Sequence, residues 1–192
     1  MPANKNLKDL QIAQRTHDQS FHRDVFHLAS PERVKHYCLH FAKYVGRIAR
    51  ERGEDEVLKR TLQTTLTDAM IISLAFSDVL NVDLDEKLEE AFGKPSKAGL
   101  EGWASLIDSA KEPMELDGLR SYVFERGATA TGELCKVAES LDHIESLEPR
   151  SLLVEGLVAW LAVILVAAHH LPMDLAANVE SRWKEIERKR VT

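Results

Sequence analysis

The chain has 192 residues, of which 44% are hydrophobic and 29% charged, and its formal net charge is −6 at pH 7. These values are ordinary for a soluble globular protein of one domain, or of two small ones sharing a core, and they exclude a disordered chain. The negative charge argues against a nucleic-acid-binding protein, because neutralising phosphates requires a basic surface.

The first half of the chain is predicted to be helical, beginning with an N-terminal helix. Ser30 and Pro31 form an N-cap followed by proline at the first helical position, and an apolar stripe of period 3.6 follows them. Gly93 ends the last helix of this half. We expect helices over residues 30–53, 54–81 and 83–92, and then a linker rich in Gly, Pro and Lys over 93–102.

Helices are also expected in the second half, and no segment alternates as a strand would. They should cover residues 103–111 and 117–126, then 128–146, 150–171 and 173–189. The fold class is therefore predicted to be all-α, a helical bundle in one compact domain. It would comprise a first half at 1–93, a linker with short helices at 94–127 and a second half at 128–192. The basic segment RWKEIERKR is interpreted as a solvated helix end.

Two features bear on the compartment. Cys38 and Cys135 lie far apart in amphipathic patterns, without the spacing of a zinc site, which predicts reduced thiols rather than a disulfide. The N-terminal segment MPANKNLKDL lacks the apolar region of a secretory signal. We therefore expect a cytoplasmic protein.

The most apolar segment, 152–171, raises the question of membrane insertion. Its uninterrupted apolar run from Gly156 to Ala168 is shorter than the roughly 20 residues that span a bilayer. A helix that is apolar all round is also typical of the buried centre of a bundle. We expect such a core helix and no membrane contact.

An internal repeat relates the two halves. The segment LNVDLDEKLEEAF at 80–92 aligns with LPMDLAANVESRW at 171–183, with matching Leu, Asp, Leu, Glu and aromatic positions. With two extra residues in the loops, Lys43 coincides with Lys136. Either the chain is duplicated, or two amphipathic helix pairs align by pattern alone. A duplication predicts two halves, each a helical hairpin plus a short helix, packed about a pseudo-twofold axis.

Asp68 is the first candidate for a functional residue. It lies within TLTDAMIISLAF on a helix face shared with Ile72 and Val79. Burying an ionised carboxylate is costly unless it is paired or bound to a cation. Asp68 is therefore predicted to form a buried ion pair or hydrogen bonds with Thr64 and Thr65, or to belong to a site, unless it is simply exposed.

Three further candidates lie in the second half. Glu155 begins the apolar helix, where it could serve a site or simply favour the helix dipole. Glu133 and Lys136 are three residues apart, a spacing that gives either a modest surface pair or part of a site.

A polar stripe runs along the helix KHYCLHFAKYVGR. His36, His40, Lys43 and Arg47 follow one another at spacings of four, three and four residues. The stripe lies nearly opposite the apolar face, so it is either solvated or lines a polar cavity between helices. His36 and His40 have a spacing that can bind zinc, but the neighbouring sequence supplies no third ligand of matching strength.

The order of elements in this chain resembles that of the all-α nucleoside triphosphate pyrophosphohydrolases. In that order, a first helix is followed by a long apolar helix headed by an acid, and then by DL before a short amphipathic helix. This MazG-like superfamily, which includes dimeric dUTPases, holds Mg²⁺ with ExxE on one helix and ExxD on the next. Asp68 stands at the Asp of ExxD, fifteen residues before Asp83 of NVDL. The ExxE positions are His40 and Lys43 in the first half and Glu133 and Lys136 in the second.

The chain departs from this pattern at several metal-ligand positions. Thr65 replaces the Glu of ExxD in the first half, and Gly156 and Ala159 replace both acids in the second, with Glu155 one residue out of register. Neither half keeps four carboxylates, although Mg²⁺ requires hard oxygen ligands.

The resemblance implies hydrolysis of a (d)NTP to (d)NMP and pyrophosphate with Mg²⁺ or Mn²⁺. Asp68 and Glu133 would be catalytic, and with Glu155 they would hold the metal. The nucleotide's phosphates would contact His40, Lys43 and Lys136. The alternatives are an inactive member that senses nucleotides or binds proteins, and an unrelated bundle. Family members pair, so a homodimer is a further expectation.

Overall fold

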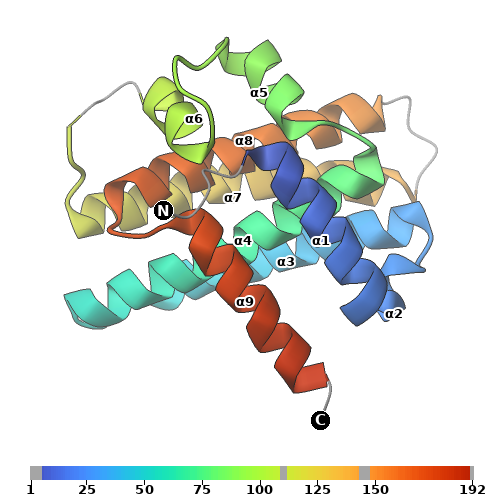
Figure 1. Ribbon diagram of the computed structural model, residues 1–192, viewed down its shortest axis with the longest axis horizontal. Helices are drawn as coiled ribbons and strands as arrows, with labels where there is room; N and C mark the ends of the chain where they lie inside the picture. Colours follow the sequence, from blue (N-terminus) through green and yellow to red (C-terminus); the bar gives the residue numbers. More distant parts are fainter. Residues whose placement is uncertain (1–5, 109–111, 143–147, 191–192) are drawn as a thin grey trace.

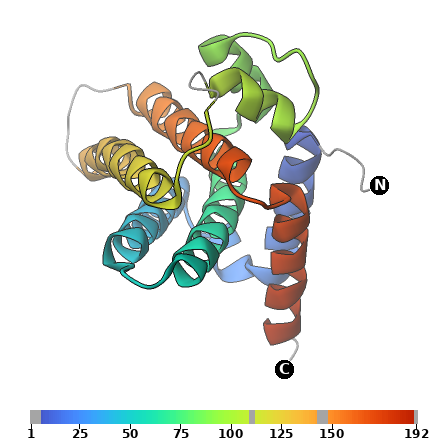
Figure 2. The same cartoon turned by 90° about the vertical axis from the view of Figure 1, so that its left-hand side faces the viewer.

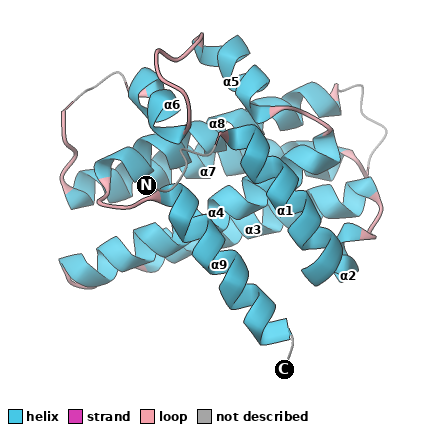
Figure 3. Ribbon diagram, viewed as in Figure 1, coloured by secondary structure: helices cyan, strands magenta, loops and turns pink. Residues whose placement is uncertain are grey.

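A computed structural model describes residues 6–108, 112–142 and 148–190, and within these ranges every regular element is an α-helix (Figures 1 and 3). This confirms the all-α prediction. The helices are α1 (Leu7–Phe21), α2 (Arg23–Phe26), α3 (Ser30–Arg50), α4 (Asp55–Leu80), α5 (Leu84–Phe92), α6 (Leu100–Ile107), α7 (Leu116–Ser140), α8 (Pro149–His170) and α9 (Leu175–Arg190).

Two antiparallel hairpins form the centre of the bundle. The α3–α4 hairpin packs beside the α7–α8 hairpin, with α3 against α7 and α4 against α8; Figure 2 views these four helices close to end-on. Phe41 of α3 stacks on Trp160 of α8 at 4.9 Å between ring centroids, and both side chains are fully buried. The core therefore lies where the two hairpins meet.

The helix α8 is buried along most of its length. Its residues 156–158 and 160–167 are all buried, as expected for a helix that is apolar all round. By length and composition α8 could cross a membrane, but 61% of its most apolar window is covered by the rest of the chain.

Four of the remaining helices pack on α4 and α8 of the central bundle. α1 and α9 pack on α4 and on each other, and α5 and α6 pack on α8 (Figure 1). Indole hydrogen bonds join each outer pair. Trp183 of α9 donates to Gln14 Oε1 of α1 at 2.7 Å, and Trp103 of α6 donates to Asp85 Oδ1 of α5 at 2.7 Å.

The turn between α4 and α5 sets the direction of the outer layer. Asn81 ends α4 in the left-handed conformation, with φ of 50°, and asparagine adopts this conformation more readily than most residues. The chain then bends by 97° from α4 into α5. Asp83 caps α5 by accepting from the backbone N–H groups of Asp85 and Glu86.

The prediction of two helices at 117–126 and 128–146 is wrong in its boundary, because α7 is continuous from Leu116 to Ser140. Gly127 does not interrupt the helix, since it lies where the Trp160 ring approaches the backbone. A Cβ at this position would lie 2.7 Å from Trp160 Cη2. Parts of the predicted helices at 103–111 and 128–146 fall on 109–111 and 143–146, outside the described residues.

Candidate functional site

Asp68 lies in the middle of α4 at the junction with α3 and α9. Only 9% of the residue is exposed. Its Oδ1 accepts from Arg182 Nε of α9 at 2.9 Å, and its Oδ2 accepts from Arg47 Nη1 of α3 at 3.2 Å. The carboxylate is therefore balanced by two guanidinium groups from two other helices, which is the ion pair that the sequence left open.

A third basic side chain, Lys43, lies beside these arginines, and we call Lys43, Arg47 and Arg182 the cationic cluster. Burial lowers the pKa of Lys43 below its usual value; Arg47 and Arg182 lower it further, and Asp68 opposes them.

A second carboxylate, that of Glu185, lies at the outer edge of the cationic cluster and pairs with two cations. Arg182 Nη1 bonds to Glu185 Oε2 at 2.6 Å, and Lys189 Nζ bonds to Glu185 Oε1 at 2.6 Å. Among the described residues, the three cations of the cluster therefore lie beside two carboxylates, those of Asp68 and Glu185, although the net charge of the chain is −6.

Tyr44 and His40 form the side of this site along α3. Tyr44 is buried, and its ring lies 5.2 Å from Lys43 Nζ and 5.4 Å from Arg47 Cζ, in cation–π geometry. Lys43 donates to His40 Nδ1 at 3.1 Å, which in turn lies 3.2 Å from the Tyr44 hydroxyl. Burial lowers the pKa of His40 to about 4, with further contributions from Lys43 and His36. His40 is therefore neutral at pH 7, and its Nδ1 accepts a hydrogen bond from the Lys43 ammonium group.

The structure brings together three of the predicted site residues, Asp68, Lys43 and His40, and leaves the others apart. Glu133, Lys136 and Glu155 are exposed on α7 and α8. In the described part of the chain these three side chains make no hydrogen bond or ion pair.

The expected magnesium ligands do not fit an ion at this place. Both oxygens of Asp68 already accept from arginines, and arginine repels a divalent cation. Neither Glu133 nor Glu155 belongs to a group of possible ligands with Asp68. Within the described ranges, the one group of three or more His, Cys, Asp or Glu side chains close enough for a shared ion is His17, Asp18 and His22.

Sequence reasoning missed both Arg182 and this histidine–aspartate group. Arg182 lies in the basic segment that was interpreted as a solvated helix end. In the structure its side chain is only 31% exposed, because it contacts Asp68 of α4. His17, Asp18 and His22 are spaced as HDxxxH in the printed sequence, a signal that could have drawn attention to α1.

A cavity of about 600 Å³ lies elsewhere, between α6, the end of α8 and the start of α9. Its walls include Leu100, Leu165, His169, Met173 and Glu180. None of the predicted site residues lines it.

Comparison with known proteins adds no relative: no family model, curated protein or solved structure matches the chain.

Proposed function

We propose that this protein binds a phosphorylated small molecule, a nucleotide, through the cationic cluster of Lys43, Arg47 and Arg182. The observation that carries the proposal is that Arg47 of α3 and Arg182 of α9 both pair with the buried carboxylate of Asp68, with Lys43 close enough for its charge to interact with theirs. An anion entering beside them would offset the repulsion among these three cations, which adds to the effect of burial in lowering the pKa of Lys43.

The chemistry of the side chains favours phosphate among possible anions. A guanidinium group presents a planar fork of N–H donors that matches phosphate oxygens, and lysine adds a mobile point charge. Arg47 and Arg182 each use part of this fork on Asp68, yet their side chains remain 33% and 31% exposed. Both arginines therefore keep donors accessible to a ligand beside their contact with Asp68.

The packing of the outer helices supports a duplicated, MazG-like origin. The helix after each hairpin packs on the other hairpin, α5 on α8 and α9 on α4. Reciprocal packing of this kind is what a pseudo-twofold relation would produce. Within that proposal, the chain keeps the nucleotide-binding place of the superfamily and replaces its metal ligands with basic side chains.

Hydrolysis of the nucleotide remains a prediction from the resemblance. The alternative of nucleotide binding without metal-dependent cleavage is favoured by the two arginines on Asp68, since they occupy the oxygens that a metal would need. We propose the binding function first and keep pyrophosphohydrolase activity as the second candidate.

Thermal unfolding with a panel of (d)NTPs, with and without Mg²⁺ or Mn²⁺, tests this function. We expect at least one nucleotide to raise the melting temperature without metal, and Arg47→Gln and Arg182→Gln to abolish the rise. Lys136→Gln is the matched control, because Lys136 is exposed and lies outside the cationic cluster. Pyrophosphate release, measured in parallel, distinguishes the two candidates. A panel with no shift, or a shift unaffected by both arginine variants, contradicts the proposal.

A further inference from the structure

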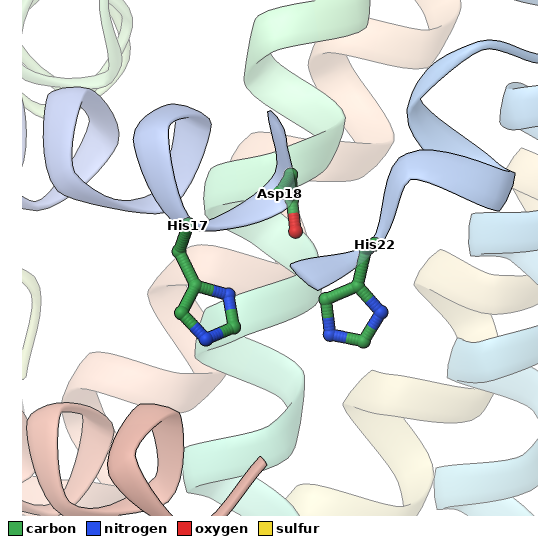
Figure 4. A group of neighbouring side chains, drawn as sticks. All are labelled: His17, Asp18 and His22. Atoms are coloured by element: carbon green, nitrogen blue, oxygen red, sulfur yellow. The ribbon is translucent and has the colours of Figure 1, made fainter. Parts of the chain in front are cut away.

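Three side chains capable of binding a metal converge where α1 ends. One ligand atom each from His17, Asp18 and His22 lies within 4.8 Å of the other two. Figure 4 shows the Asp18 carboxyl group between the two imidazole rings. His17 and Asp18 are 6% and 7% exposed, so the group is mostly shielded from water.

Local backbone structure explains how a segment of six residues, 17–22, brings these ligands together. His17 and Asp18 are adjacent on α1, so their side chains diverge by about 100° around the helix axis. His22 is the C-cap of α1, and its N–H bonds to the Asp18 carbonyl at 3.0 Å. The end of the helix therefore returns the third ligand to the face of the first two.

Aromatic contacts hold His17 at this place. Its ring lies 5.0 Å from that of Phe21 and stacks at 6.0 Å on that of Trp183, a residue of α9. From the same helix, Glu187 Oε1 lies 3.9 Å from His17 Nε2. A fourth donor is thus within reach on an element far away in the sequence.

We propose that His17, Asp18 and His22 bind one divalent transition-metal ion, with Zn²⁺ the ion that these ligands favour and Glu187 in reach of it. Imidazole nitrogen and carboxylate oxygen bind Zn²⁺ at about 2.0–2.2 Å in tetrahedral geometry. The ligand atoms must close from within 4.8 Å to about 3.4 Å of one another, a movement that side-chain rotation supplies. The ion would connect the end of α1 with α9.

The charges around this site favour a cation. Burial raises the pKa of Asp18 to about 6, against a lowering by the bond from Gln14 and by Arg33. Arg33 itself is paired with Asp78 at 3.3 Å. A metal ion would add positive charge beside the buried Asp18 carboxylate, for which Gln14 and Arg33 compensate only in part.

Titration of untagged, chelator-treated protein with Zn²⁺ by isothermal calorimetry tests the site. We expect one equivalent to bind the unaltered chain, and His22→Gln and Asp18→Asn each to weaken binding at least about tenfold, because each removes a ligand. Asp18→Asn keeps the acceptor for Gln14 and removes a buried charge, so it should fold at least as well as the parent.

Two histidine variants provide the controls. His27→Gln removes an exposed imidazole just after α2 and should bind Zn²⁺ as the unaltered chain does. His36→Gln tests the competing pair of His36 and His40, whose ring centroids are 4.7 Å apart, and should also leave binding unchanged. The inference is overturned if the unaltered chain binds no Zn²⁺, if His22→Gln and Asp18→Asn bind it normally, or if His36→Gln abolishes binding.

Discussion

Replacing Asp68 with Asn separates the proposed anion site from a metal site, because the two accounts predict opposite changes in nucleotide affinity. Asp68 is the anion that Arg47 and Arg182 already contact, at 3.2 and 2.9 Å. If these arginines receive a phosphate, the carboxylate competes with it. If Asp68 instead holds a metal against the phosphates, its removal weakens binding.

The size of the effect follows from the charges. A phosphate on the outer side of the two arginines would lie about 6 Å from the carboxylate. At that distance two unit charges repel by about 0.7–1.4 kcal/mol at a dielectric constant of about 40–80. Asp68→Asn should therefore tighten metal-free nucleotide binding by a factor of roughly three to ten.

The same substitution should also destabilise the fold, because two charge-assisted hydrogen bonds to a buried group are weakened. With arginines that are about a third exposed, we expect a loss of about 1–2 kcal/mol in the free energy of unfolding. Denaturant unfolding measures this loss and confirms that the variant is folded before binding is compared.

Calorimetric titration of Asp68→Asn with nucleotide in a chelating buffer is the assay. Glu133→Gln is the matched control, since it changes the net charge equally at an exposed site and should leave affinity nearly unchanged. Weaker binding by folded Asp68→Asn than by the unaltered chain would refute the reasoning.

Two further predictions concern stability. Gly127→Ala should lower the free energy of unfolding by about 1–3 kcal/mol, because the added Cβ meets the Trp160 ring. Gly132→Ala is the control and should not lower it, because nothing lies within 4 Å of the added Cβ; denaturant unfolding measures both variants. Without metal, the free energy of unfolding should fall by up to about 3 kcal/mol as the pH rises from 3.8, the pKa of Asp18 in the unfolded chain, through about 6, its pKa in the fold. The reason is that the buried carboxyl group keeps its proton in the fold after the unfolded chain has lost it. Asp18→Asn should lack this loss in unfolding measured across pH, and an identical pH dependence would contradict the assignment.

Much of the fold follows from local sequence signals. Pro31 lies in the first turn of α3 as predicted, although the N-cap is Ala29 and not Ser30, and the apolar segment around Trp160 forms the buried α8. The predicted break near Gly127 failed because glycine signals a helix end only when nothing packs against it. Here the glycine accommodates an indole ring from the neighbouring helix, which is a tertiary contact.

The candidate site was only partly predictable for the same reason. The stripe of His40, Lys43 and Arg47 is visible as a helical period on one element. Its partner Arg182 lies in a segment whose local pattern is that of a solvated helix end. What places that arginine on Asp68 is the crossing of α9 over α4, and no local spacing encodes this.

The most direct test of the central claim is calorimetric titration of the unaltered chain and of Arg182→Gln with the nucleotide that gives the largest thermal shift, in the presence of a chelator. The cationic cluster predicts saturable binding of one equivalent by the unaltered chain and loss of that binding in the folded variant. Binding that requires added Mg²⁺, or that survives in Arg182→Gln, would contradict it.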